Sequence, residues 1–186
     1  MTAYNILISI ISRLRTLHGD RRGVAAVEFS LILPIMLTIY LGGVEIGDGF
    51  AIDTRVTLVA RSVTDLATQY VTIDNQDMSN ILGASTTILA PYAAANIIVT
   101  VSEITTDSSG NGTVTWSDSL NGTARTVGTK ITLPTSLKTA NISIIFGEVS
   151  YNYTPALGYT ITGTITMSDS FYMMPRLVNS VTRSNS

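Results

Sequence analysis

Few side chains in this 186-residue sequence have the chemistry of a catalytic or metal-binding residue. The sequence has no cysteine and one histidine, His18, which excludes disulfides, thiolate metal sites and a cysteine nucleophile. Without residues 1–23, the chain also lacks histidine, the residue most used to activate a nucleophile and a common zinc ligand. We therefore expect no metal and no cofactor. The remaining candidates are the carboxylates of Glu103, Asp107, Asp118, Glu148 and Asp169.

Two carboxylates at a suitable separation can hydrolyse a glycosidic bond. Asp107 and Asp118 have the sequence context of turn residues, and no spacing in the chain places two of the five carboxylates together. A membrane-tethered hydrolase is thus the least favoured alternative, and we expect no enzymatic activity. Residues 107–112 resemble a calcium loop only superficially, because they lack the ligand spacing and terminal glutamate of an EF-hand. They predict a hairpin turn.

The charge distribution indicates a membrane protein. Only 13% of the residues are charged and 45% are hydrophobic, which is too apolar for a disordered chain. Arg13, Arg15, Arg21 and Arg22 precede the first long apolar run, and beyond residue 23 the acids outnumber the bases. No basic patch remains to neutralise phosphates, so we expect no nucleic-acid partner.

Residues 24–47 form the apolar run, and as a helix they would cover roughly 36 Å, enough to cross a bilayer core of about 30 Å. Arginines lie before the run, whereas Glu45, Asp48 and Asp53 lie at its end and beyond it. The positive-inside rule then places residues 1–23 in the cytoplasm and everything after residue 47 outside. The sequence predicts a single-pass membrane protein with its C-terminal domain outside the cytoplasm.

The elements after the span predict an α+β fold. Within the helical region 48–92, one apolar stripe recurs at spacings of three and four, and a second helix is expected over 80–90, capped by Asp77 or Ser79 and stopped by Pro91. Residues 93–186 predict an antiparallel β meander with turns at 107–112, 121–122 and 155–158. The stripe comprises Ile52, Val56, Val59, Val63 and Leu66, and the expected strands are 97–104, 113–117, 130–133, 142–153 and 159–171.

Four residues within the span call for an explanation. Glu28 is costly to bury, by roughly 2.5–3.5 kcal/mol at the bilayer centre; either it lies shallow enough to reach water, or it meets a positive partner such as the amino group of a neighbouring subunit. Pro34 removes a helix hydrogen bond and either bends the helix or is a tolerated kink. Gly43 and Gly47 form a small-xxx-small pair that allows close helix packing.

The start of the span resembles the processing site of type IV prepilins and pseudopilins. Arg21, Arg22 and Gly23 are followed by Val24-Ala-Ala-Val-Glu28-Phe and a long apolar run. Within that family, residues 22–47 look most like the TadE-like minor pilins of tight-adherence systems. The stretches 151–155 and 172–176 are similar to the aromatic-Pro strand and the Tyr-x-x-Pro-Arg ending common there.

This resemblance implies a pilin-like fold, with a long N-terminal helix, a short second helix and a C-terminal antiparallel sheet. It implies that a prepilin peptidase cuts between Gly23 and Val24, and that Glu28, at the fifth mature position, assists assembly. The resemblance also implies a location in the bacterial inner membrane, with a periplasmic C-terminal domain. The expected partners are other pilin subunits and the assembly machinery of a pilus for attachment or secretion.

One alternative stays open, a signal-anchored domain that binds a glycan or a protein and joins no filament. Its binding platform would come from the aromatic side chains of the β region, although aromatics in strands more often pack into a core. The candidates are Trp116, Tyr151, Tyr153, Tyr159 and Tyr172.

Overall fold

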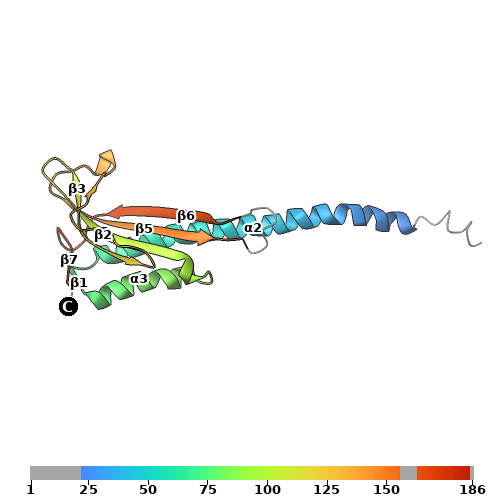
Figure 1. Cartoon of the computed structure of the whole chain (residues 1–186), viewed down its shortest axis with the longest axis horizontal. Coiled ribbons are helices and arrows are strands. Elements are labelled where there is room, and N and C mark those ends of the chain that lie inside the picture. Colours follow the sequence, from blue (N-terminus) through green and yellow to red (C-terminus); the bar gives the residue numbers. More distant parts are fainter. Residues whose placement is uncertain (1–21, 156–162, 185–186) are drawn as a thin grey trace, which may run out of the picture. The chain divides into compact units, whose positions relative to one another are not determined.

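The computed structural model describes residues 22–155 and 163–184, and the chain divides into two compact units, Met1–Val44 and Glu45–Ser186. The described residues form the α+β, pilin-like arrangement that the sequence predicts (Figure 1). In chain order, the elements are α2 (Arg22–Thr68), β1 (Thr72–Ile73), α3 (Asn75–Leu89), η1 (Ala94–Asn96), β2 (Ile97–Thr106), β3 (Gly112–Leu120), β4 (Lys130–Ile131), η2 (Thr135–Leu137), β5 (Ser143–Tyr153), β6 (Ile165–Met173) and β7 (Thr182–Arg183).

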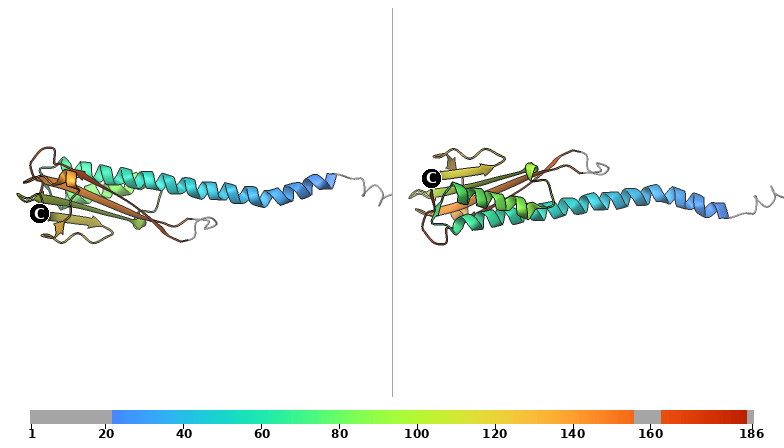
Figure 2. Two further views of the ribbon diagram at one scale, coloured as in Figure 1. Left: turned by 90° about the horizontal axis from the view of Figure 1, so that it is seen from above. Right: turned by 90° about the horizontal axis from the view of Figure 1, so that it is seen from below.

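Helix α2 buries the stripe that its sequence predicts. Ile52, Val56, Val59 and Val63 are almost completely buried, and Leu66 is partly buried against the same core. These residues recur at three- and four-residue spacing, so they share one helix face. Within the unit Glu45–Ser186, this part of α2 and helix α3 cover one face of the sheet (Figure 2). The core lies between the helices and that face.

Gly147 in β5 lets α2 approach the sheet closely. A Cβ atom at this position would lie 1.9 Å from the Thr64 hydroxyl oxygen and 3.4 Å from the Ala60 carbonyl oxygen. Thr64 is itself buried and donates its hydroxyl to the Ala60 carbonyl at 2.6 Å. No side chain fits between the two elements here, so glycine is required by packing.

Helix α3 begins five residues before the predicted start. Its N-cap is Asp74, whose carboxylate accepts a hydrogen bond from the backbone N–H of Asp77 at 2.7 Å, and the Asp77 side chain completes a capping box. The predicted caps Asp77 and Ser79 were therefore wrong, although Asp77 contributes as the third helical residue. The other end agrees with the prediction, because α3 ends at Leu89, ahead of Pro91.

The sheet is antiparallel, but the predicted meander is wrong. The strand order is β4-β3-β2-β5-β6, so β5 pairs with β2 and not with its predecessor β4. Strand β4 has two residues, whereas β2 and β5 have 10 and 11. The two long strands can form many more backbone hydrogen bonds with each other than either could with β4. The chain therefore crosses back to the free side of β2.

The turn at residues 107–112 is the hairpin that the sequence predicts. It joins β2 to β3, and the Asp107 carboxylate accepts hydrogen bonds from the backbone N–H groups of Ser109 and Asn111 at 2.8 and 2.9 Å. Gly110 has a φ of 77°, which favours glycine. The predicted turn at 155–158 falls mostly on residues outside the described ones, as does the start of the strand expected at 159–171.

Two further contacts hold the C-terminal segment, and the sequence predicted neither. Strands β1 and β7 form a separate two-stranded parallel sheet. Arg176 donates its backbone N–H to the Thr68 carbonyl at 2.9 Å and pairs its guanidinium with Asp65. The Tyr-x-x-Pro-Arg ending thus supplies a donor and a cation at the C-terminal end of α2, where carbonyl groups lack intrahelical partners.

Candidate functional site

The residues of the predicted cleavage and assembly motif lie at the N-terminal end of α2. Gly23 and Val24 follow the first described residue of the helix, and Glu28 lies one to two turns further along. Glu28 and Val24 are exposed, as are the side chains that follow them up to Tyr40. The backbone N–H groups of a first helical turn have no intrahelical partners. The motif is therefore held on a regular helix with its one carboxylate uncovered.

Pro34 and the glycine pair lie further along the same helix. α2 continues through Pro34, and the Pro34 carbonyl accepts a hydrogen bond from the Thr38 hydroxyl at 2.8 Å. Gly43 and Gly47 are exposed, and a Cβ atom at either position would meet nothing within 4 Å. The helix backbone is therefore uncovered at each of these two glycines.

The first half of α2 carries a continuous set of exposed apolar side chains. Among the described residues, α2 is the one helix long and apolar enough to cross a membrane. Water would surround these side chains in a soluble protein, at a cost of about 25 cal/mol for each Å² of apolar surface. The larger ones are Val24, Val27, Phe29, Leu31, Ile32, Leu33, Ile35, Met36, Leu37, Ile39, Tyr40 and Val44.

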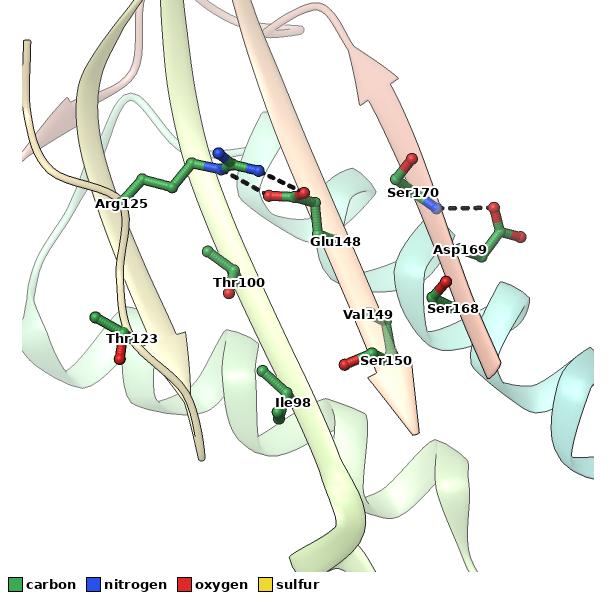
Figure 3. A pocket seen from close by; sticks show the side chains of 10 residues that line it. All are labelled: Ile98, Thr100, Thr123, Arg125, Glu148, Val149, Ser150, Ser168, Asp169 and Ser170. Atoms are coloured by element: carbon green, nitrogen blue, oxygen red, sulfur yellow. Dashed lines mark hydrogen bonds and ion pairs between the residues drawn. The ribbon is translucent and has the colours of Figure 1, made fainter. Parts of the chain in front are cut away.

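Four of the five candidate carboxylates line two separate grooves of the unit Glu45–Ser186, and the fifth, Asp107, lies in the turn between β2 and β3. Glu148 and Asp169 border a groove of about 550 Å³ on the sheet, which Figure 3 shows. Arg125 pairs with both carboxylate oxygens of Glu148, at 2.6 and 2.8 Å. The Asp169 carboxylate instead accepts hydrogen bonds from the Thr57 hydroxyl of α2 and the Ser170 backbone N–H. The two acids thus have different partners.

Glu103 and Asp118 line the second groove, of about 460 Å³. Asp118 pairs with Arg183 at 2.9 Å. Glu103 is 1% exposed, and one of its oxygens accepts hydrogen bonds from the Ser143 hydroxyl, the Ser180 hydroxyl and the Val181 N–H. Its other oxygen, Oε2, is buried without a hydrogen-bond partner. Glu103 therefore anchors the C-terminal segment to the inner face of the sheet.

The local electrostatics follow from these contacts. The hydrogen bond to Glu148 raises the pKa of Arg125, and burial, followed by the charge of Glu148, raises the pKa of Tyr172. The side-chain hydrogen bond from Asn111 lowers the pKa of Asp107. These pKa shifts favour the charged forms of Arg125 and Asp107 and the neutral form of Tyr172.

Three of the five aromatic side chains pack into the core, which the sequence analysis favoured over a binding platform. Trp116, Tyr151 and Tyr153 are at most 8% exposed and belong to the core. Tyr172 is half-buried and stacks on Phe146 with 4.2 Å between the ring centroids. Tyr159 lies outside the described residues.

Sequence reasoning missed the arginines of both grooves. Arg125 lies between β3 and β4, and Arg183 lies in β7, so each reaches its carboxylate only through the tertiary fold. No local spacing signals such pairs. An apolar groove beside α2, lined by Ile46, Phe50 and Met167 among others, was also missed.

The comparison with protein families identifies the helix. Residues 23–65 match the model of the TadE family, described as TadE-like protein. This segment of the chain is similar to TadE-like proteins. The TadE-like segment comprises most of α2, from Gly23 to Asp65, the residue that pairs with Arg176. The matched segment is less than half of the chain. Searches of curated proteins and of solved structures returned no match.

Proposed function

We propose that this protein is a minor pilin or pseudopilin of a tight-adherence system. Residues 24–47 anchor it in the inner membrane, residues 1–23 are a cytoplasmic leader, and the helical region 48–92 and β region 93–186 lie outside the cytoplasm. One observation carries the proposal. An apolar helix whose first half is uncovered belongs to a segment that matches the TadE family.

Assembly exchanges one apolar environment for another. In the membrane, acyl chains cover the exposed side chains of α2; in a filament, the helices of neighbouring subunits cover them. Because both environments exclude water, little hydrophobic free energy separates them. Polar and charged contacts then decide which helices pair and with what stagger.

Glu28 supplies the charged contact in this scheme. A prepilin peptidase removes residues 1–23 and leaves the amino group of Val24 as a new cation. The Glu28 carboxylate of one subunit pairs with the Val24 ammonium of its neighbour, which compensates both charges away from water. Pro34 bends the helix, and Gly43 and Gly47 admit a neighbouring helix at close range.

N-terminal sequencing of the protein from native membranes tests the cleavage, with cells that lack the prepilin peptidase as the comparison. We expect a start at Val24 that depends on the peptidase. A Gly23→Val variant should keep its leader, whereas the matched variant Gly43→Val should be cut normally. Glu28→Gln should be cut normally but reduce pilus assembly.

An intact leader in peptidase-positive cells, or a cut beyond residue 47, contradicts the proposal. Either result leaves the signal-anchored binding domain. One feature favours that second candidate, the open polar groove in which the Arg125–Glu148 pair and several serines are accessible to a ligand (Figure 3). Binding of a glycan or protein that Arg125→Ala abolishes would support it.

A further inference from the structure

The unit Glu45–Ser186 has an apolar groove that its own core does not fill. The groove has a volume of about 230 Å³ and lies between α2 and the paired strands β5 and β6. A Cβ atom at Gly49 would lie 3.7 Å from the Met167 methyl carbon and 3.9 Å from the Tyr153 ring, so strands and helix meet at its floor. Its rim is exposed: Ile46, Phe50 and Ile165 are 46%, 71% and 37% accessible.

The chain itself limits how far this groove can lie from the end of the proposed span. Ile46 belongs to the span, and Phe50 follows its last residue, Gly47, by three positions. Three residues cover at most about 11 Å even when fully extended, and about 4.5 Å in a helix. The boundary between acyl chains and headgroups is therefore within reach of the groove.

Within the unit Glu45–Ser186, the start of α2 presents an exposed apolar pair to the groove. Ile46 and Phe50 are four residues apart and so lie on one helix face. Both side chains are exposed.

We propose that this groove is a membrane-contact site. Its exposed rim residues Phe50, Ile46 and Ile165 insert into the outer surface of the membrane that holds the helix. This inference rests on the proposed membrane span and goes beyond it, because it assigns a membrane contact to a sheet strand. Asp53, the charged residue that lines the groove, faces the headgroup layer, where the ammonium of phosphatidylethanolamine offers the opposite charge. This contact holds one side of the unit Glu45–Ser186 against the bilayer before assembly.

The absence of cysteine from the sequence allows a direct test. A fluorescent label is attached to single variants of the full chain, each placed in nanodiscs of phosphatidylethanolamine and phosphatidylglycerol with one protein copy per disc. Nitroxide lipids quench labels in the bilayer, and iodide quenches labels in water. The test variants are Phe50→Cys and Ile165→Cys, the span control is Ile39→Cys, and the water controls are Leu58→Cys and Val127→Cys, all at exposed apolar positions.

At Phe50 and Ile165 we expect nitroxide quenching close to that at Ile39 and roughly threefold or more above that at Leu58. Suppose that iodide quenches Phe50 and Ile165 as much as Val127, while nitroxide lipids still quench Ile39. This result contradicts the proposed membrane contact of the groove and leaves the proposed span unaffected. Iodide quenching at Ile39 contradicts the span itself. Shielding at Phe50 that appears only with several copies per disc overturns the lipid proposal and assigns the groove to a second copy.

Discussion

Gly147 is the residue on which the distance between α2 and the sheet depends. Its missing side chain leaves room for the Thr64 hydroxyl, which a Cβ atom would approach to 1.9 Å. A contact that short requires the helix or the strand to move. Overpacking of a rigid contact between two elements typically costs 1–3 kcal/mol.

We predict that Gly147→Ala lowers the free energy of unfolding by about 1–3 kcal/mol. Denaturant titration of the unit Glu45–Ser186 measures the change. Thr64→Ala removes the clashing hydroxyl, so the double variant should lose less stability than the sum of the two single variants. Gly83→Ala, at a helical position with nothing within 4 Å, is the matched control and should be neutral or stabilising. Equal effects at Gly147 and Gly83 would contradict this account.

Asp107 gives the turn between β2 and β3 a dependence on pH. Its pKa is lowered, chiefly by the hydrogen bond from the Asn111 side chain. A carboxylate with a lowered folded-state pKa stabilises the fold above its unfolded pKa of about 3.9, and this contribution is lost as the pH falls through the folded value. We predict that the amide protection factors of Ser109 and Asn111, taken relative to the intrinsic exchange rate at each pH, fall below roughly pH 4. In Asp107→Asn, the protection factors should lose this pH dependence; an unchanged profile would show that another group is responsible.

At the scale of elements, α3 depends on its N-cap. Asp74 accepts from the Asp77 N–H, and the Asp77 side chain lies 3.4 Å from the Asp74 N–H. An N-cap carboxylate satisfies one free N–H and complements the positive end of the helix. Asp74→Ala should cost about 0.5–2 kcal/mol, measured by thermal or denaturant unfolding. Ser79→Ala, inside the helix, should change the stability by much less. A larger loss of stability in Ser79→Ala than in Asp74→Ala would instead support Ser79 as the N-cap.

The elements also show what local sequence can and cannot predict. The buried stripe of α2 and the hairpin at Asp107 follow from spacing and turn chemistry within a few residues, and both were predicted correctly. The strand order and the Arg125–Glu148 pair depend on which strands meet, over 23 residues or more of intervening chain. The predicted start of α3 was wrong for a different reason. Asp74, Asp77 and Ser79 can all cap a helix, and a start at Asp74 places Met78 and Ile81 in the core.

For the whole molecule, the buried hydrophobic core begins at Ile52 and lies entirely within the second compact unit. No core side chain of the described residues comes from the span. Stability of the unit should therefore not require the membrane, because its apolar burial is internal.

We predict that a fragment of residues 45–186 folds by itself. Circular dichroism should show one cooperative thermal transition, at a Tm close to that of the full chain in nanodiscs. The Phe50→Ser version of this fragment should be equally stable and less prone to self-association, because Phe50 is 71% exposed. Non-cooperative unfolding of the fragment would show that the part of α2 before residue 45 is needed for the stable packing of the helix on the sheet.

If the unit is exported as we propose, the anchoring of the C-terminal segment has a consequence for the order of events during export. The Trp116 indole donates to the Val181 carbonyl, Glu103 accepts from the Val181 N–H, and β1 pairs with β7. These three attachments join residues 72–73, 103 and 116 to the same short stretch around residue 181. A chain threading through a translocation channel delivers that stretch after every other part of the core. Until it emerges, Glu103 has only the Ser143 hydroxyl to hydrogen-bond and lacks the contacts from Ser180 and Val181. The unit should therefore complete its fold only once translocation has passed residue 183.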